Sequence, residues 1–327
     1  MRKWAAAVPL VCLALVVGCG GDDESSSDES SASGGGGKNY SMTLIAGVKG
    51  DEFYITMNCG AQAKAKELGV TLDFQGPDKF DASQQTPVVN AVAAKKPDAM
   101  LSAPTDTKAM FAPIKQVADA GSKVVLVDTT LEKPDMAVSQ IASDNLEGGR
   151  EAGRTLLKLI GGKGKVLVVN VKPGISTTDA RGKGFEEAVK GKPGVEYLGQ
   201  EYSNDDPAKA SSIVTATLAK HPDLKGIFGA NLFSAEGAAA GLRQAGKLGD
   251  VKIVGFDAGP KQVKDLEDGL VQALIAQKPA DIGRQGVEQA VAALDGKPTK
   301  KEIGTGFEVV TKDNLDQMRD VLYKPEC

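Results

Sequence analysis

The sequence has very little histidine and cysteine, two residue types that catalysis and metal binding often use. Its 327 residues contain one histidine, His221, and four cysteines. That histidine stands in Lys220-His221-Pro222-Asp223, a pattern typical of the turn that ends a helix. No Ser-His-Asp, Cys-His or Cys/His metal arrangement can be assembled elsewhere. A carboxylate pair such as Asp128 and Asp257 could hydrolyse a glycoside, but nothing in the spacing favours it. We expect no enzyme, metal site or cofactor.

An excess of positive charge is also missing. The chain carries 39 Lys and Arg against 43 Asp and Glu, for a formal net charge of -4. Without a basic stripe to hold phosphates, nucleic acid is excluded as an expected partner. The glycine-rich segment 161–165 precedes a predicted strand, whereas a phosphate loop follows one, so it predicts a helix-to-strand turn.

Long apolar runs are scarce, and the one at the N-terminus is short. Arg2-Lys3 precedes the apolar residues 4–17, which are too few to span a bilayer comfortably and have the layout of a secretory signal. The end of this segment resembles a lipobox, which predicts acylation of Cys19; an ordinary signal with an incidental cysteine is the alternative. Polar residues 20–38 then predict a flexible tether. We expect a signal peptide at 1–18, a lipidated tether at 19–40, and an extracytoplasmic protein anchored to the membrane.

From residue 41 onward, short apolar runs alternate with helical patterns, which predicts an α/β fold with doubly wound parallel sheets. The predicted strands are 42–48, 70–74, 99–103, 123–128, 166–170, 195–202, 226–230, 251–257, 270–276 and 307–310. The predicted helices are 53–68, 84–95, 107–120, 145–160, 179–190, 208–220, 235–245, 260–268, 280–294 and 312–321. Ligands of such sheets bind beyond the carboxyl ends of the strands, where this sequence places many carboxylates and amides.

A series of short motifs, in one order and spacing, adds a family resemblance. The motifs are Phe53-Tyr54 with Gly60-Ala61-Gln62, Val127-Asp128, Ile141-Ala142-Ser143-Asp144-Asn145 with Gly148-Gly149, Arg181-Gly182-Lys183-Gly184-Phe185, His221-Pro222-Asp223, Phe228 to Asn231, Val254-Gly255-Phe256-Asp257, and Ile275-Ala276-Gln277. On these motifs, residues 41–310 resemble the ribose-type periplasmic binding proteins, the type I sugar-binding proteins of ABC importers.

The resemblance implies two Rossmann-like lobes joined by a three-crossing hinge, with lobe one at 41–142 plus 278–306 and lobe two at 143–277 plus 307–327. It implies a monomer that captures a small sugar, polyol or amino sugar and delivers it to an ABC permease and its ATPase. A receptor of the same fold that signals rather than transports is the alternative. A transcription regulator of this fold is excluded by the lipobox and by the absence of a helix-turn-helix segment.

Carried over residue by residue, the family's binding positions fall on this chain as follows. The aromatic stacking pair falls on Phe53 and Tyr54, and the strand-end aspartate on Asp128. The polar residues of lobe two and its hinge fall on Asn231, Asp257 and Gln277. Asp257 is expected at an open cleft, so its replacement should leave the unliganded fold intact.

Four positions depart from the family pattern. Asp51 replaces an asparagine, Thr129 and Asp179 replace arginines, and Asp205 lies near an aromatic position. We therefore expect no arginine in the cleft and up to five carboxylates facing it, those of Asp51, Asp128, Asp179, Asp205 and Asp257. Lys49 is the nearest counter-charge in sequence, and a cationic or hydroxyl-rich ligand would also compensate.

The two cysteines that remain after Cys12 and Cys19 are assigned are Cys59 and Cys327. Because two cysteines in an exported protein are more often bridged than free, we predict a disulfide between them. It would pin the C-terminal tail to the first helix of lobe one.

Overall fold

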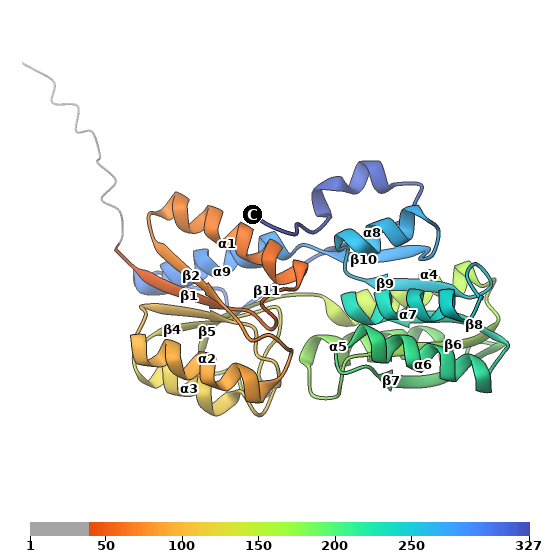
Figure 1. Cartoon of the computed structure of the whole chain (residues 1–327). Helices are drawn as coiled ribbons and strands as arrows, with labels where there is room; N and C mark the ends of the chain where they lie inside the picture. The colour runs from red at the N-terminus through yellow and green to blue at the C-terminus, as the bar shows by residue number, and fades with distance from the viewer. Residues whose placement is uncertain (1–38) are drawn as a thin grey trace, which may run out of the picture. The chain divides into compact units, whose positions relative to one another are not determined.

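The fold is built on two separate β-sheets of six strands each. The computed structural model describes residues 39–327, so Cys19, the predicted signal and most of the tether lie outside the described part. In Figure 1 the first sheet lies on the left and the second on the right. Each sheet with its helices is called a lobe below.

The first sheet is entirely parallel, in the order β11-β5-β4-β3-β1-β2. Its strands are β1 (Ser41–Ile45), β2 (Thr71–Gln75), β3 (Ala99–Ser102), β4 (Lys123–Val127), β5 (Ala137–Ser143) and β11 (Glu302–Thr305). Its helices are α1 (Glu52–Leu68), α2 (Ala82–Lys95), α3 (Phe111–Asp119) and α9 (Pro279–Leu294).

The second sheet has the order β12-β10-β9-β8-β6-β7 and is parallel except for its edge strand β12. Its strands are β6 (Gly164–Asn170), β7 (Val195–Tyr202), β8 (Leu224–Gly229), β9 (Lys252–Phe256), β10 (Ala273–Gln277) and β12 (Phe307–Val310). Its helices are α4 (Asn145–Leu159), α5 (Ser176–Val189), α6 (Pro207–Lys220), α7 (Leu232–Gln244) and α8 (Pro260–Glu267), with a final 3-10 helix at Leu315–Val321.

Helices cover both faces of the first sheet, which explains its continuous apolar strands. Leu44 and Leu101 belong to one hydrophobic cluster, whereas their neighbours Ile45 and Met100 belong to a second. Because successive side chains of a strand point to opposite faces, every position of such a strand has to be apolar.

The chain passes between the sheets three times. It leaves the first sheet after β5, returns after β10, and crosses again between β11 and β12. Helix α9 packs on α1 and on strands β3, β4 and β5, although it follows the whole second sheet in sequence. All three crossings lie beside the carboxyl ends of the strands.

Two helix pairs pack so closely that only glycine fits between them. A Cβ atom at Gly60 of α1 would lie 2.0 Å from the carbonyl oxygen of Ala280 in α9. In the second lobe, a Cβ atom at Gly149 of α4 would lie 2.1 Å from the carbonyl oxygen of Arg181 in α5. Close backbone packing therefore fixes where α5 places its side chains.

The elements differ from the sequence expectation in a few places. Strands β5 and β11 were not predicted, because β5 alternates buried and half-buried residues and β11 is largely exposed. Helix α3 begins at Phe111 rather than 107, since the Asp106 carboxylate accepts hydrogen bonds from the N–H groups of Lys108 and Ala109 (2.8 and 2.7 Å) and holds a turn there. The last helix, predicted from residue 312, is a 3-10 helix from Leu315.

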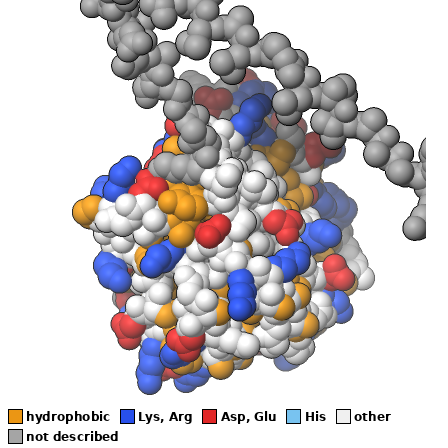
Figure 2. All heavy atoms as spheres, turned by 90° about the vertical axis from the view of Figure 1, so that its left-hand side faces the viewer, with side chains coloured by type: hydrophobic (Ala, Val, Ile, Leu, Met, Phe, Trp, Pro, Cys, Tyr) orange, Lys and Arg blue, Asp and Glu red, His pale blue; other side chains and the backbone are white. Residues whose placement is uncertain are grey.

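Charged side chains of both signs are interspersed on the face that lies on the left of Figure 1, as Figure 2 shows. Such mixing is typical of a solvated surface. Within residues 39–327, no helix combines the length and apolar character needed to cross a membrane.

Candidate functional site

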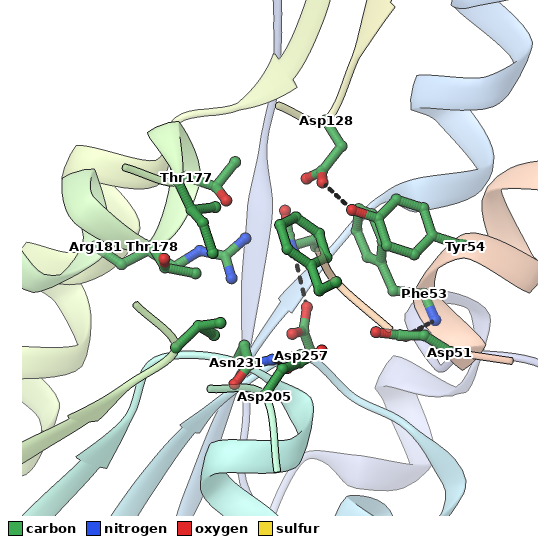
Figure 3. Close-up of a pocket in the computed structure, with 14 residues that line it drawn as sticks. Asp51, Phe53, Tyr54, Asp128, Thr177, Thr178, Arg181, Asp205, Asn231 and Asp257 are labelled. Atoms are coloured by element: carbon green, nitrogen blue, oxygen red, sulfur yellow. Dashed lines mark hydrogen bonds between the residues drawn. The ribbon is translucent and has the colours of Figure 1, made fainter. Parts of the chain in front are cut away.

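A cavity with about 400 Å3 of empty space, part of it open to solvent, lies between the lobes, at the carboxyl ends of both sheets. Figure 3 shows Phe53 and Tyr54 on one side of it, Thr177, Thr178 and Arg181 on the opposite side, and Asp128 and Asp257 between them. It is lined by Asp51, Phe53, Tyr54, Phe80, Asp128, Val171, Ile175, Thr177, Thr178, Arg181, Asp205, Asn231, Asp257 and Gln277.

The first turn of α1 supplies the aromatic wall. The Asp51 carboxylate caps this helix by accepting a hydrogen bond from the N–H of Phe53 (2.8 Å), which fixes the entry of both aromatic residues. The rings of Phe53 and Tyr54 meet edge to face with centroids 5.1 Å apart. A Cβ atom at Gly47 would lie 2.5 Å from the Tyr54 hydroxyl and 2.4 Å from the Phe80 ring, so the glycine leaves room for both.

Asp128 follows β4 and is buried. The Tyr54 hydroxyl donates to its Oδ2 atom (2.7 Å). Burial raises the pKa of Asp128 to about 6, although the Arg181 charge and the Tyr54 hydrogen bond act in the opposite direction. Its φ of 63° lies in the left-handed region, which aspartate tolerates better than most residues and which is found where function fixes the backbone.

Asp257 follows β9 in the second lobe and is held by three donors. Its Oδ2 accepts from the N–H of Leu232 (3.0 Å), and its Oδ1 accepts from Gln277 Nε2 (2.7 Å) and the Tyr323 hydroxyl (2.9 Å). Only 4% of Asp257 is exposed, and its φ is 79°. The expected open-cleft position is therefore wrong: this carboxylate is a buried, fully oriented acceptor.

Asn231 and Asp205 form a pair at the lower edge of the cavity. Asn231 caps α7 through its Oδ1 atom, which accepts from the N–H of Ser234, and its Nδ2 donates to Asp205 Oδ1 (2.6 Å). Burial raises the pKa of Asp205 to about 6 against this hydrogen bond, with the Asp257 charge adding to the rise. Burial and the charges of Asp257 and Asp205 also raise the pKa of Asp51 well above its usual value.

Arg181 contradicts the expectation that no arginine faces the cleft. Its guanidinium is buried, donates from Nε to Asn145 Oδ1 (2.8 Å) and from Nη1 to the carbonyl of Ala230 (3.0 Å), and lies 3.8 Å above the Phe256 ring centre. It lowers the pKa of Asp128. One guanidinium thus faces four cavity carboxylates, those of Asp51, Asp128, Asp205 and Asp257.

The phase of α5 explains why this arginine was missed. Residues 177 and 181 are one helical turn apart and share a face, whereas residue 179 points elsewhere. In the sequence, the family's binding position carries over to Asp179, and Arg181 belongs only to the motif at 181–185 on which the resemblance rests. A helical-wheel count from the helix start could have found it.

Three further residues predicted for the site do not line the cavity. Lys49 is exposed. Thr129 is buried, and its hydroxyl donates to the carbonyl of Pro104 (2.8 Å). Asp179, in the first turn of α5, accepts through Oδ2 from the N–H of Gly174 (2.9 Å) in the loop that precedes the helix. The lining residues not predicted are Phe80, Val171, Ile175, Thr177, Thr178 and Arg181.

Several polar atoms of the cavity have no hydrogen-bond partner within residues 39–327. Gln277 Oε1 and Thr178 Oγ1 are both buried and unpaired. Asp51, Asp128 and Asp205 each use one carboxylate oxygen in the bonds above, which leaves the other oxygen available. Since buried polar groups are normally paired, these acceptors point to a bound molecule rich in donors. Among the described residues, no group of His, Cys, Asp or Glu could hold a metal ion.

Contacts between the lobes close the cavity. The N–H of Thr107 donates to the carbonyl of Gly174 (3.0 Å), and the N–H of Thr130 donates to Ser176 Oγ (2.9 Å). Lys172 of the second lobe lies 3.7 Å from the Asp81 carboxylate of the first. A ligand in the cavity would therefore be enclosed by both lobes.

Comparison with known proteins gives consistent matches. A family model described as a periplasmic binding protein domain matches residues 42–298. The ribose import binding protein of Escherichia coli is 33% identical over 276 residues, covering 83% of this chain and 90% of that protein.

Two solved structures from Agrobacterium vitis are also similar. An ABC transporter solute-binding protein bound with α-D-tagatopyranose is 45% identical, with a TM-score of 0.86 over 88% of this chain and 100% of that one. Another, with bound D-fucose, is 31% identical, with a TM-score of 0.82 over 86% and 99%.

Proposed function

The chain belongs to the periplasmic binding protein family, and from this premise we propose that it captures a small sugar or sugar alcohol and delivers it to an ABC permease. It acts by binding, as its relatives do, and not by catalysis.

The observation that carries this proposal is the set of unpaired acceptors in the cavity. Four oxygens can still accept hydrogen bonds: Gln277 Oε1 and one oxygen each of Asp51, Asp128 and Asp205. A sugar offers several hydroxyl donors around one ring, and its apolar C–H face can lie against Phe53. The Arg181 guanidinium can donate hydrogen bonds to those ligand oxygens that act as acceptors.

The charge balance does not require a cationic ligand. Arg181 compensates part of the acidic charge, and the pKa values of Asp128 and Asp205, raised by burial to about 6, reduce it further in mildly acidic solution. An amino sugar is thus not required for compensation. The 45% identity to a protein bound with α-D-tagatopyranose makes D-tagatose the first ligand to test.

Capture uses closure of the two lobes over the ligand. We place the moving units at 41–142 plus 278–306 and at 143–277 plus 307–327, since the crossings lie between them; within the second unit, residues 324–327 are fastened to α1 of the first lobe. The family location is extracytoplasmic. Acylation of Cys19 would anchor the protein to the membrane beside the permease and its ATPase, where it acts as a monomer.

Thermal unfolding with a panel of sugars tests the proposal. At a ligand concentration of 100 times Kd, binding stabilises the native state by about 2.7 kcal/mol, which corresponds to a rise in Tm of roughly 5–10 °C. The panel contains D-tagatose, D-fucose, D-ribose, myo-inositol and glucosamine, with amino acids as controls. A rise for a sugar or polyol is expected, and a rise only for amino acids would contradict the proposal.

A further inference from the structure

The C-terminal tail approaches the sugar site from outside the cavity. After the 3-10 helix Leu315–Val321, the tail places Tyr323 beside the second lobe, where only 4% of this residue is exposed. The N–H of Tyr323 donates to the carbonyl of Ala258 (3.0 Å). Tyr323 does not line the cavity, so any effect on a ligand has to act through another residue.

The Tyr323 hydroxyl links two residues of the site. It donates to Asp257 Oδ1 (2.9 Å) and accepts from the backbone N–H of Gln277 (3.1 Å). The Tyr323 ring also meets the Phe53 ring of the first lobe, with centroids 5.8 Å apart. One side chain therefore contacts the strand-end carboxylate, the hinge residue and the aromatic wall.

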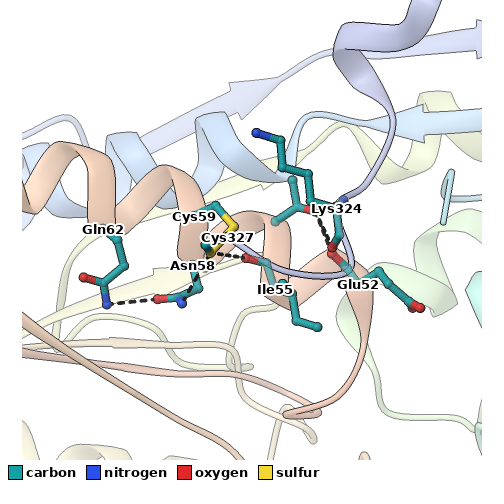
Figure 4. Close-up of a disulfide and its surroundings, with 8 residues drawn as sticks. Glu52, Ile55, Asn58, Cys59, Gln62, Lys324 and Cys327 are labelled. Atoms are coloured by element: carbon teal, nitrogen blue, oxygen red, sulfur yellow. Dashed lines mark hydrogen bonds between the residues drawn. A yellow bond between two sulfur atoms is a disulfide. The ribbon is translucent and has the colours of Figure 1, made fainter. Parts of the chain in front are cut away.

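The residues that follow Tyr323 are fastened to the first lobe, as Figure 4 shows. The N–H of Lys324 donates to Thr56 Oγ1 of α1 (2.7 Å), and Cys327 is bonded to Cys59 of α1 in a disulfide. The four residue steps between Tyr323 and Cys327 can span at most about 14 Å. The tail is thus a fourth crossing between the lobes, closed by a covalent bond.

We propose that Tyr323 is a positioning residue for Asp257 in the sugar site, and that the Cys59–Cys327 disulfide holds Tyr323 in place. The inference rests on the proposed function. Without the hydroxyl, Asp257 Oδ1 keeps only the Gln277 amide as donor, and the N–H of Gln277 loses its acceptor. Without the disulfide, the residues after Tyr323 keep only hydrogen bonds to the first lobe, such as those to Thr56, and Tyr323 is held in place by its own contacts alone.

Calorimetric titration with D-tagatose tests the role of the hydroxyl. Tyr323→Phe keeps the ring contact with Phe53 but removes two buried hydrogen bonds, so the ligand-free Tm should fall by a few degrees. Affinity should fall about tenfold, as expected for one hydrogen bond to a charged group. Tyr40→Phe is the matched control, because the Tyr40 hydroxyl also donates to an aspartate, Asp295 (3.2 Å), remote from the cavity. The control should bind with wild-type affinity.

Removing the disulfide tests the role of the tail. Cys59→Ser/Cys327→Ser should weaken binding at least threefold in the wild-type background, and it should have no further effect in the Tyr323→Phe background. Reduction of the wild type by dithiothreitol, which converts the disulfide to two thiols as the dithiol is oxidised, should reproduce the weaker binding. Equal weakening in both backgrounds would show that the disulfide acts without Tyr323 and would overturn the proposal.

A ligand-free measurement separates this inference from the proposed function. Hydrogen exchange at the N–H of Leu232, which donates to Asp257 Oδ2, should be faster in Tyr323→Phe and unchanged in Tyr40→Phe. If the wild type binds none of the sugars, the proposed function fails and this exchange rate still decides the positioning role. Unchanged exchange, or affinity within twofold of wild type, would overturn it.

Discussion

Replacing Asp257 by alanine should weaken ligand binding and lower the stability of the unliganded protein together. The carboxylate accepts hydrogen bonds from Leu232, Gln277 and Tyr323 and is 4% exposed. Hydrogen bonds to a charged group contribute about 1.5–3 kcal/mol each, and water from the adjacent cavity can re-partner some of the stranded donors. We expect a net loss of about 3 kcal/mol in the free energy of unfolding.

Two assays measure the effect of Asp257→Ala. Differential scanning calorimetry of the ligand-free variant should show a Tm about 5–10 °C lower than that of the wild type. Titration with D-tagatose should show affinity reduced by about a hundredfold or more, because 1.4 kcal/mol corresponds to a tenfold change in Kd.

Asp265→Ala is the matched control for this experiment. Asp265 is equally buried, at 4% exposed, and belongs to the same lobe, but it pairs with Lys261 (2.6 Å) and does not line the cavity. This variant should lose stability without losing affinity. An Asp257→Ala protein with a Tm within 2 °C and an affinity within threefold of wild type would refute the reasoning, since about 3 kcal/mol is predicted for each.

Three other predictions concern pH, helix packing and anchoring. Burial raises the pKa of Asp205 to about 6, so the stability that this residue contributes should be lost as pH rises from about 4 to 6, by about 1.4 kcal/mol per pH unit. In Asp205→Asn, the Tm should therefore change less steeply with pH over this range than in the wild type. Equal slopes of Tm against pH in the two proteins would contradict this prediction. Gly149→Ala should lower the free energy of unfolding, measured in urea, by about 2 kcal/mol or more, and it should weaken D-tagatose binding because the added Cβ displaces Arg181. Gly304→Ala is the control: its Cβ would meet nothing within 4 Å, so neither stability nor binding should change. Cys19→Ala should release the protein from membrane fractions or block its processing, and unchanged membrane association would exclude a lipid anchor.

The sequence predicted the two-sheet fold well because most of its strands are buried on both faces. Such strands appear as continuous apolar runs, and some of the helices between them end at a glycine or lysine, as α1 does at Gly69 and α2 at Lys96. Strands β5 and β11 carry no such signal, since one is half-buried and the other largely exposed. Their place in the first sheet comes from pairing, of β5 with β4 and of β11 with β5.

The site was predictable where it depends on strand ends and less so elsewhere. Asp128, Asp257 and Gln277 directly follow or end a strand, and all three line the cavity. Whether Arg181 faces the cavity depends on which face of α5 is turned toward it, and an error of two residues in assigning that face puts Arg181 on the wrong side of the helix. The position of Tyr323 depends on the path of the tail, and the sequence pattern around it does not specify that path.

A crystal structure of the protein with bound D-tagatose would test the central claim most directly. The account predicts sugar density in the cavity between the lobes, with hydroxyl oxygens within about 3.2 Å of the carboxylates of Asp128 and Asp257 and of the Arg181 guanidinium. Density for the sugar at any other place, with this cavity filled only by water, would contradict it.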